Sequence, residues 1–198
     1  MKNVIKTIKK SLIIATMFAS ILGNATDVSL ITIKEDVKKT ALTINNVKKG
    51  NLLSIKDSNG IILYKELIKT TGTYKKGFDL AVLPDGSYSF VINKDLEINT
   101  IPFSVNSSKV LFNKEKETTI HKPYLKQENG IIYITKFAPN LKPLNITIYK
   151  KFNGDFELLH SEKVKDIQVI QKAYKLEKGN YKIVLNSDNN EYTEFINN

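Results

Sequence analysis

The sequence predicts an all-β protein made of two tandem antiparallel β-sandwiches. A phrase of the form Leu-x-x-Gly-x-Tyr-x-apolar-x-apolar occurs around Gly86 and again around Gly179, 93 positions later. An Asn-Gly pair, which is the strongest short signal of a β-hairpin, precedes each copy, at 59–60 and at 153–154. After the first 25 residues the apolar residues alternate over short runs, as they do in strands with one buried face.

Residues 1–25 are expected to form a helical signal peptide. Four lysines at positions 2, 6, 9 and 10 precede an apolar run from Ser11 to Leu22, and Gly23-Asn24-Ala25 follows with small residues at its ends. This order is typical of a secretory leader that is cleaved near Ala25. The apolar run of twelve residues is shorter than a membrane-spanning helix. We therefore expect an exported mature protein without a stable membrane span.

The first sandwich is predicted over residues 26–106, with about seven short strands. The strands are expected at 28–33, 41–47, 52–56, 61–67, around 78–80, around 88–92 and at 98–105. Asp57-Ser-Asn-Gly60 is expected to make a hairpin turn, and residues 72–76 a turn-rich passage. The polar segment Asn106-Ser-Ser108 is the predicted boundary between the two domains.

The second sandwich is predicted over residues 109–198. Its expected strands lie near 118–125, 131–135, 144–149, 156–159, 168–176, 181–185 and 192–196. Pro123 interrupts the first of them, which suits an edge strand because proline cannot donate to a ladder. Hairpin, Gly-x-Tyr strand and closing strand follow in the same order in both halves, which indicates an internal repeat.

The stretch from Leu80 through Pro84-Asp85-Gly86 to Tyr88 resembles the corner before strand F of immunoglobulin-like and fibronectin type III domains. In that corner a tyrosine hydrogen-bonds back to the backbone, so Tyr88 and Tyr181 are expected to be corner tyrosines. Ile146 to Tyr149, Asn153-Gly154 and the second Gly-x-Tyr strand are also similar to the C-terminal sorting domains of type IX secretion in Bacteroidetes. This resemblance implies a Gram-negative source and a periplasmic, secreted or cell-surface location.

The charge pattern restricts the partners of the protein. The chain carries a formal net charge of +10, and all 30 basic residues are lysine. Loss of the leader leaves 26 lysines against 20 acidic residues. Specific recognition of bases and phosphates usually uses the planar arginine fork, so we do not expect a nucleic-acid partner. The chain has no cysteine, which excludes disulfides, thiolate metal sites and a lipid anchor on cysteine.

No residue set in the sequence nominates a catalytic, cofactor-binding or metal site. His121 and His160 lack the spacing of a zinc site or a catalytic triad, so we expect no functional role for either. His160 follows Leu158-Leu159, and we expect it at a strand end on the surface. Asp57 to Gly60 and Ser187 to Glu191 are oxygen-rich turns, and weak calcium binding is the alternative to a simple hairpin for each.

Four tyrosine-lysine pairs form the remaining candidate surface. They are Tyr64-Lys65, Tyr74-Lys75, Tyr149-Lys150 and Tyr174-Lys175. Strand alternation would place each tyrosine inside and each lysine outside, and a sugar-stacking or anion-binding surface is the alternative. The sequence as a whole favours a non-catalytic exported protein for binding or adhesion, or one associated with the cell envelope, with an unknown protein or glycan partner. The alternatives are a carbohydrate-binding module, which would show exposed coplanar aromatic rings on one face, and a cargo of type IX secretion.

Overall fold

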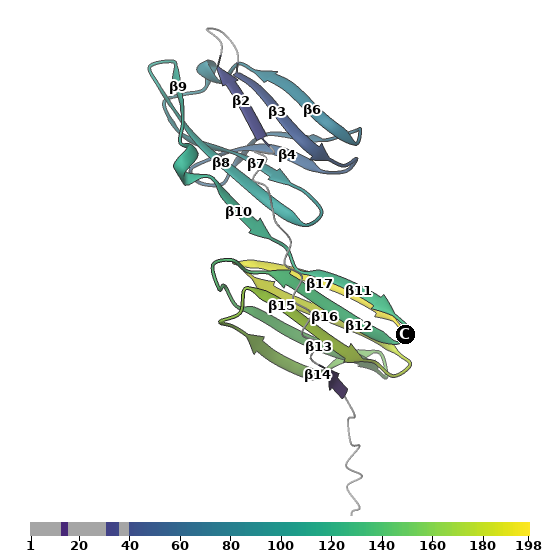
Figure 1. The fold of residues 1–198 in the computed structure, drawn as a ribbon. Helices are drawn as coiled ribbons and strands as arrows, with labels where there is room; N and C mark the ends of the chain where they lie inside the picture. The colour runs from purple at the N-terminus through teal and green to yellow at the C-terminus, as the bar shows by residue number, and fades with distance from the viewer. Residues whose placement is uncertain (1–12, 16–30, 36–39) are drawn as a thin grey trace, which may run out of the picture. The chain divides into compact units, whose positions relative to one another are not determined.

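The computed structural model describes residues 13–15, 31–35 and 40–198, with only the backbone at 13–15, 34 and 35. The chain divides into a first unit, residues 22–121, and a second unit, residues 122–198 together with 1–21. Within the described residues there is no helix long and apolar enough to span a membrane. In each unit, two antiparallel sheets enclose a single hydrophobic core (Figure 1).

In the first unit, seven strands in chain order form sheets of order 1-2-5 and 4-3-6-7. The first sheet holds β2 (Ile31–Glu35), β3 (Thr40–Val47) and β6 (Gly72–Phe78). The second sheet holds β5 (Ile62–Leu67), β4 (Leu52–Asp57), β7 (Gly86–Asn93) and β8 (Glu97–Asn106). Two further strands, β9 (Lys109–Phe112) and β10 (Thr118–His121), both pair with β8. The short 3₁₀ helices are η1 (Leu80–Val82) and η2 (Lys114–Lys116).

The second unit repeats the same strand order. One sheet holds β11 (Tyr124–Glu128), β12 (Ile131–Phe137) and β15 (Val169–Lys175). The other holds β14 (Asp155–Val164), β13 (Leu144–Phe152), β16 (Asn180–Ser187) and β17 (Asn190–Asn197). Two sheets with this topology packed over one core make an immunoglobulin-like sandwich. The predicted all-β fold of two tandem sandwiches is therefore confirmed.

Alternation along the strands builds both cores. In β7, Tyr88, Phe90 and Ile92 are buried while their neighbours are only partly covered, and Tyr181, Ile183 and Leu185 of β16 repeat this pattern. Aromatic rings dominate the first core, where Phe90 lies between Phe78, Phe103 and Phe112. The second core is mainly aliphatic.

Both predicted corner tyrosines are confirmed. The hydroxyl of Tyr88 donates to the carbonyl of Pro84 at 2.7 Å, and that of Tyr181 donates to the carbonyl of Glu177 at 3.0 Å. The glycine two residues earlier leaves room for each corner. A Cβ at Gly86 would lie 3.3 Å from the Tyr88 hydroxyl, and one at Gly179 would lie 3.1 Å from the Lys150 side chain. The glycine of the repeated Gly-x-Tyr phrase is thus explained at Gly86 by packing against the corner tyrosine, and at Gly179 by a φ of +149°, which other residues rarely adopt.

The boundary between the units differs from the prediction. Ser107 and Ser108 form the turn of a hairpin in which Asn106 pairs with Lys109, so the apolar residues after them stay in the first unit. The expected strand near 118–125 is two strands, β10 and β11, and Pro123 lies between them. Because Pro123 cannot donate to a ladder, the chain leaves one sheet there and enters the next.

The fifth strand of the first unit also differs from the prediction. Residues 72–78 form β6, although we expected a turn before a strand at 78–80. Gly77 pairs with Ala41, and Tyr74 pairs with Ile44, so the ladder is regular from Tyr74 to Phe78, and its register shifts before Gly72 pairs with Val47. The burial of Phe78 fixes its register, and the chain then turns through η1.

Most of the predicted signal peptide lies outside the described residues, as do residues 28–30 of the expected first strand. Ile13–Ala15 form the short strand β1 and not a helix, and they pair antiparallel with Ala173 to Lys175 of β15. A β-branched segment fits such an edge, because an edge strand has unpaired backbone groups.

Candidate binding surface

The two histidines do not form a polar site. His121 ends β10 opposite Glu97. His160 lies inside β14, only 19% exposed, with its ring 5.5 Å from the Tyr174 ring and Nε2 3.5 Å from Glu162. We expected His160 at a strand end on the surface, and this expectation is wrong, because the strand continues to Val164. No group of three or more His, Asp or Glu in the described part of the chain could hold a metal ion.

The two acidic turns use their carboxylates within the fold. Asp57 Oδ1 accepts from the backbone amides of Asn59 and Ile61, at 2.9 and 2.8 Å, which closes the predicted hairpin. Asp188 accepts from Lys136 Nζ at 2.7 Å, and this lysine is almost fully buried. A carboxylate that neutralises a buried lysine stabilises the fold, and its removal would be costly.

A carboxylate clasp, made of Glu66, Tyr64, Tyr74 and Lys76, joins the two sheets of the first unit. Glu66 Oε2 accepts from Lys76 Nζ at 2.6 Å, from the Tyr74 hydroxyl at 2.9 Å and from the Tyr64 hydroxyl. The hydrogen bonds from Lys76 and Tyr64 hold the pKa of Glu66 at about 2, well below its usual 4.5. Burial and the hydrogen bond to Glu66 raise the pKa of Tyr74.

The second unit has an equivalent clasp, made of Glu162, Lys172 and Tyr174. Glu162 on β14 accepts from Lys172 Nζ at 2.8 Å and from the hydroxyl of the buried Tyr174, both on β15. Burial acts to raise the pKa of Glu162, but the hydrogen bonds from Lys172 and Tyr174 hold it below its usual value. Burial, followed by the hydrogen bond to Glu162, raises the pKa of Tyr174.

Sequence reasoning missed both clasps, although a signal for them was present. Glu66 and Glu162 are 96 positions apart, and so are Lys76 and Lys172. This offset differs from the 93 that relates the Gly-x-Tyr strands, because the second unit has extra residues in β14 and fewer in the connection between β15 and β16. A search for repeats at several offsets would have found the pair.

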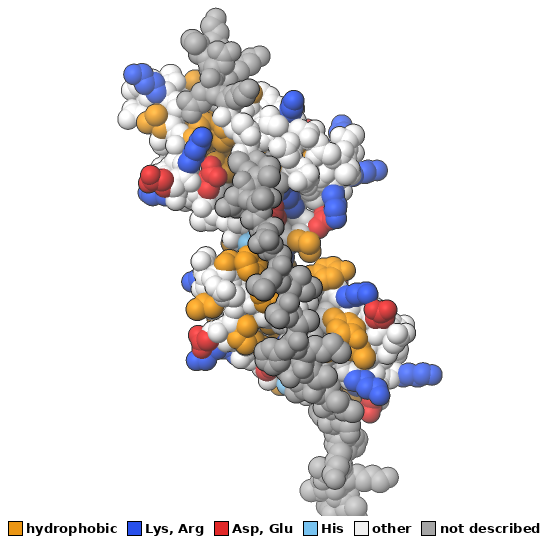
Figure 2. Space-filling model, viewed as in Figure 1, with side chains coloured by type: hydrophobic (Ala, Val, Ile, Leu, Met, Phe, Trp, Pro, Cys, Tyr) orange, Lys and Arg blue, Asp and Glu red, His pale blue; other side chains and the backbone are white. Residues whose placement is uncertain are grey.

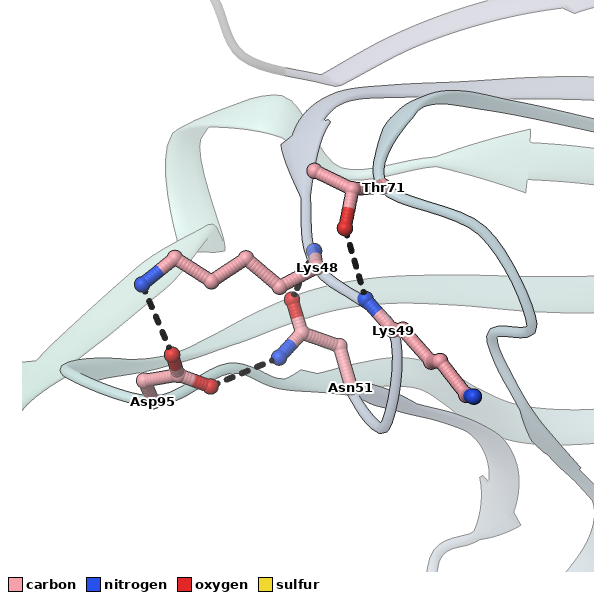
Figure 3. Close-up of polar contacts among 5 residues, drawn as sticks. All are labelled: Lys48, Lys49, Asn51, Thr71 and Asp95. Atoms are coloured by element: carbon pink, nitrogen blue, oxygen red, sulfur yellow. Dashed lines mark hydrogen bonds and ion pairs between the residues drawn. The ribbon is translucent and has the colours of Figure 1, made fainter.

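A polar network ties together three loops at one end of the first unit (Figure 3). Asp95 accepts from Lys48 Nζ at 2.9 Å and from Asn51 Nδ2 at 3.0 Å. Asn51 Oδ1 accepts from the backbone amide of Lys48, and Thr71 accepts from the amide of Lys49. In Figure 3 these groups face one another, and only the Lys49 ammonium points away. The network therefore fixes the loops and does not offer a preformed polar site.

The four tyrosine-lysine pairs do not act together. Tyr64 and Tyr74 belong to the first clasp, and Tyr174 is fully buried. Tyr149 lies with its ring under a lysine of the paired strand β16, because Lys182 Nζ is 4.5 Å from the ring centre, whereas the lysine over Tyr64, at 5.1 Å, is Lys76 of the first clasp. The predicted alternation of tyrosine inside and lysine outside thus holds best for Tyr174.

An aromatic–lysine surface, made of Tyr149, Lys151, Phe156, Lys182 and Phe195, covers the outer face of the β14-β13-β16-β17 sheet. Lys182 Nζ also lies 5.5 Å from the centre of the Phe156 ring, and Lys151 Nζ lies 5.9 Å from it. The Phe156 and Phe195 rings are 5.9 Å apart, and Phe195 is 68% exposed. Figure 2 shows, on the face it views, that other hydrophobic side chains also reach the surface among scattered lysines on both units.

The first unit lacks this surface at the corresponding positions. In the second unit Lys182 pairs with Tyr149 on one side and with Phe195 on the other. Ser89 of β7 has the same place in the first unit, and it pairs with Lys56 and Pro102. The sandwich therefore forms without aromatic residues at these positions, and the fold does not require the surface.

The rings of the surface are not coplanar. The Phe156 and Phe195 planes are inclined by 56°, and Lys182 covers the Tyr149 and Phe156 rings. The flat array of exposed rings expected of a carbohydrate-binding module is thus not found in this cluster. Within this surface Phe195 offers a largely exposed ring, next to the Phe156 ring that Lys151 and Lys182 flank.

No family model matches the chain, and no curated protein matches it either. Among solved structures, the FN1–FN3 domains of chicken CNTN1 align with 84% of this chain at 12% identity, with a TM-score of 0.27. The alignment spans 65% of that structure's chain. The similarity is too low to inform function, so the immunoglobulin-like assignment depends on the strand order and the two tyrosine corners. The expected kinship with type IX sorting domains finds no support in these comparisons.

Proposed function

We propose that this chain is a non-catalytic exported binding protein, and that the aromatic–lysine surface of the second unit holds its partner. The observation that carries the proposal is the difference between the two units. The same sandwich has Lys56, Ser89 and Pro102 in the first unit where the second has Tyr149, Lys182 and Phe195. Exposure of large apolar groups to water costs free energy, so exposed aromatic residues that the fold does not need indicate a binding partner.

The chemistry of the surface favours an anionic partner. Lys151 and Lys182 stack on aromatic rings, and no carboxylate of the described residues forms an ion pair with either. The aromatic rings hold the ammonium groups in place through their π faces. Positioned, unpaired ammonium groups next to an exposed ring can bind a negatively charged group with an apolar flank.

The non-catalytic part of the proposal is supported by how the polar residues are used. Glu66 and Glu162, two carboxylates with lowered pKa values, accept hydrogen bonds from tyrosine and lysine side chains of the facing sheet. Asp57 and Asp188 close turns or neutralise a lysine. Hydrogen bonds of this kind stabilise the sandwich, and they leave these four carboxylates without the convergent acid-base arrangement of an active site.

Export through the predicted leader is also a proposal, and so is the cell-envelope location of the partner. The leader is supported by the order of lysines, apolar run and small residues in the first 25 positions. A role as type IX cargo stays a prediction. Fusion of residues 122–198 to a reporter in a type IX-competent host tests it, and retention in the periplasm would exclude it.

A pull-down from the producing cell's envelope tests the proposed surface. The bait is the mature protein, compared with a Phe195→Ala, Lys182→Gln variant. A Leu111→Ala, Lys65→Gln variant is the matched control, because Leu111 is 63% exposed on β9 and Lys65 is exposed on β5. We expect the surface variant to lose the captured material and the control to keep it. Equal capture by both variants would refute the proposal that this surface binds the partner.

A further inference from the structure

We infer that the ligand of the aromatic–lysine surface is an acidic polysaccharide, an inference that rests on the proposed function of that surface. Two ammonium groups flank a single ring. Lys182 Nζ and Lys151 Nζ lie 5.5 and 5.9 Å from the centre of Phe156, so their separation cannot exceed the sum of these two distances. The distance between carboxylates on neighbouring or next-neighbouring uronic acid residues of a glycan also lies below this limit.

The exposed ring supplies the second part of the recognition. Phe195 is on β17, 5.9 Å from Phe156, and it pairs with Lys182 on β16. Its free ring can stack against the C–H face of one sugar. The 56° tilt between the two phenylalanine rings excludes stacking of a flat neutral chain on both rings at once. Charge must therefore contribute a large part of the binding, which favours acidic over neutral sugars.

The shape of the surface favours an extended polymer. The residues lie across the whole width of the β14-β13-β16-β17 sheet. Strand spacing makes this width about 14 Å, enough for a short run of sugars. The surface is open, so a chain can cross it without an end being bound.

Other anionic partners fit less well. A protein strand cannot add to this face, because the central strands β13 and β16 are paired on both sides. A membrane would require apolar groups that project into the lipid, whereas this flat face exposes mainly Phe195 and Leu158. A nucleic acid would be served better by arginine, which the chain does not contain. Acidic proteins and anionic vesicles are therefore the competing outcomes of the test.

Affinity electrophoresis of the mature protein in gels that contain polygalacturonate tests the inference at physiological salt. Neutral dextran is the glycan control, and phosphatidylglycerol vesicles and an acidic polypeptide, polyglutamate, are probed in parallel by co-sedimentation and by gel shift. The variants are Lys151→Gln, Lys182→Gln for the surface and Lys65→Gln, Lys109→Gln as a control with the same loss of charge. Circular dichroism of each variant confirms that it is folded.

We expect retardation by polygalacturonate and none by dextran. The surface variant should bind about tenfold more weakly, since each exposed ion pair changes affinity severalfold at most. The control variant should change less than twofold, and Phe195→Ala should weaken binding with all lysines intact. Equal weakening in both lysine variants, or stronger binding to vesicles or polyglutamate, would overturn the inference. If no acidic glycan binds but the envelope pull-down still depends on the surface, the inference fails and the proposed function stands.

Discussion

The carboxylate clasp of the first unit gives the sharpest prediction about stability. Replacement of Glu66 by glutamine keeps the size of the side chain and removes its charge. In the wild type Glu66 Oε2 accepts from Lys76 Nζ at 2.6 Å and from the Tyr74 hydroxyl at 2.9 Å, across the gap between the two sheets. The variant would weaken the link between β5 and β6.

The lowered pKa sets the size of the effect. A shift of the Glu66 pKa from 4.5 to about 2 corresponds to at most about 3 kcal/mol of stability. The Glu66 side chain is 28% exposed, so water screens part of this interaction. We therefore expect Glu66→Gln to destabilise the first unit by about 1–2 kcal/mol at pH 7.

The pH dependence follows from the direction of the shift. Because the folded-state pKa is below the unfolded value, this stabilisation is fully present above about pH 4.5 and is lost as pH falls toward 2. Hydrogen exchange of the amides in β5 and β6, measured at pH 7 and at acid pH, reads the first unit separately. Glu117→Gln is the control on an exposed carboxylate of the same unit. A Glu66→Gln variant as stable as wild type at pH 7, or a difference that does not change with pH, would refute the reasoning.

Three further predictions concern the corners, the buried lysine and the leader. Tyr88→Phe and Tyr181→Phe should each cost about 1 kcal/mol in urea unfolding, because a corner carbonyl loses its donor, and Tyr149→Phe should cost almost nothing. No loss in either corner variant would contradict the assignment of the corners. Asp188→Asn should destabilise the second unit by about 2–3 kcal/mol, since it removes the carboxylate that forms an ion pair with the buried Lys136, and a Lys136→Met, Asp188→Asn variant should recover most of the loss. Unchanged hydrogen exchange of β12 and β16 in the Asp188→Asn variant would contradict this. Mass spectrometry of protein secreted by a Gram-negative host should find a chain that begins near Thr26, and an intact N-terminus would exclude cleavage of the leader.

The fold could be predicted because its signals are local and repeated. Asn59-Gly60 and Asn153-Gly154 mark the hairpins, and Gly86 and Gly179 mark the two tyrosine corners. These positions predicted the number of units and the places of most strands along the chain, but not the order of the strands in the sheets.

The errors in the fold arose where tertiary contacts override local preference. The lysines and glycines of β6 suggest a turn, but the burial of Phe78 and the ladder with β3 make the segment a strand. Ser107-Ser108 looks like a linker, yet it is the turn of a hairpin whose second strand pairs with β8. In neither case does the sequence near the segment reveal the partner strand.

The candidate surface could not be predicted because it depends on register. Tyr149, Phe156, Lys182 and Phe195 lie on four strands, and only the pairing of β13, β14, β16 and β17 places their side chains together. The pair Tyr149-Lys150 drew attention to the right tyrosine with the wrong lysine, because Lys150 instead pairs with Glu177 at the corner. The lysine over the Tyr149 ring comes from another strand.

A hydrogen-exchange footprint of the mature protein, with and without its captured envelope partner, tests the binding surface most directly. We predict that protection on binding falls on the strands β13, β14, β16 and β17 of the second unit, around Lys182 and Phe195. The amides around Ser89 in the first unit should not change. Protection confined to the first unit, or spread over the loops around Asp95, would contradict the account.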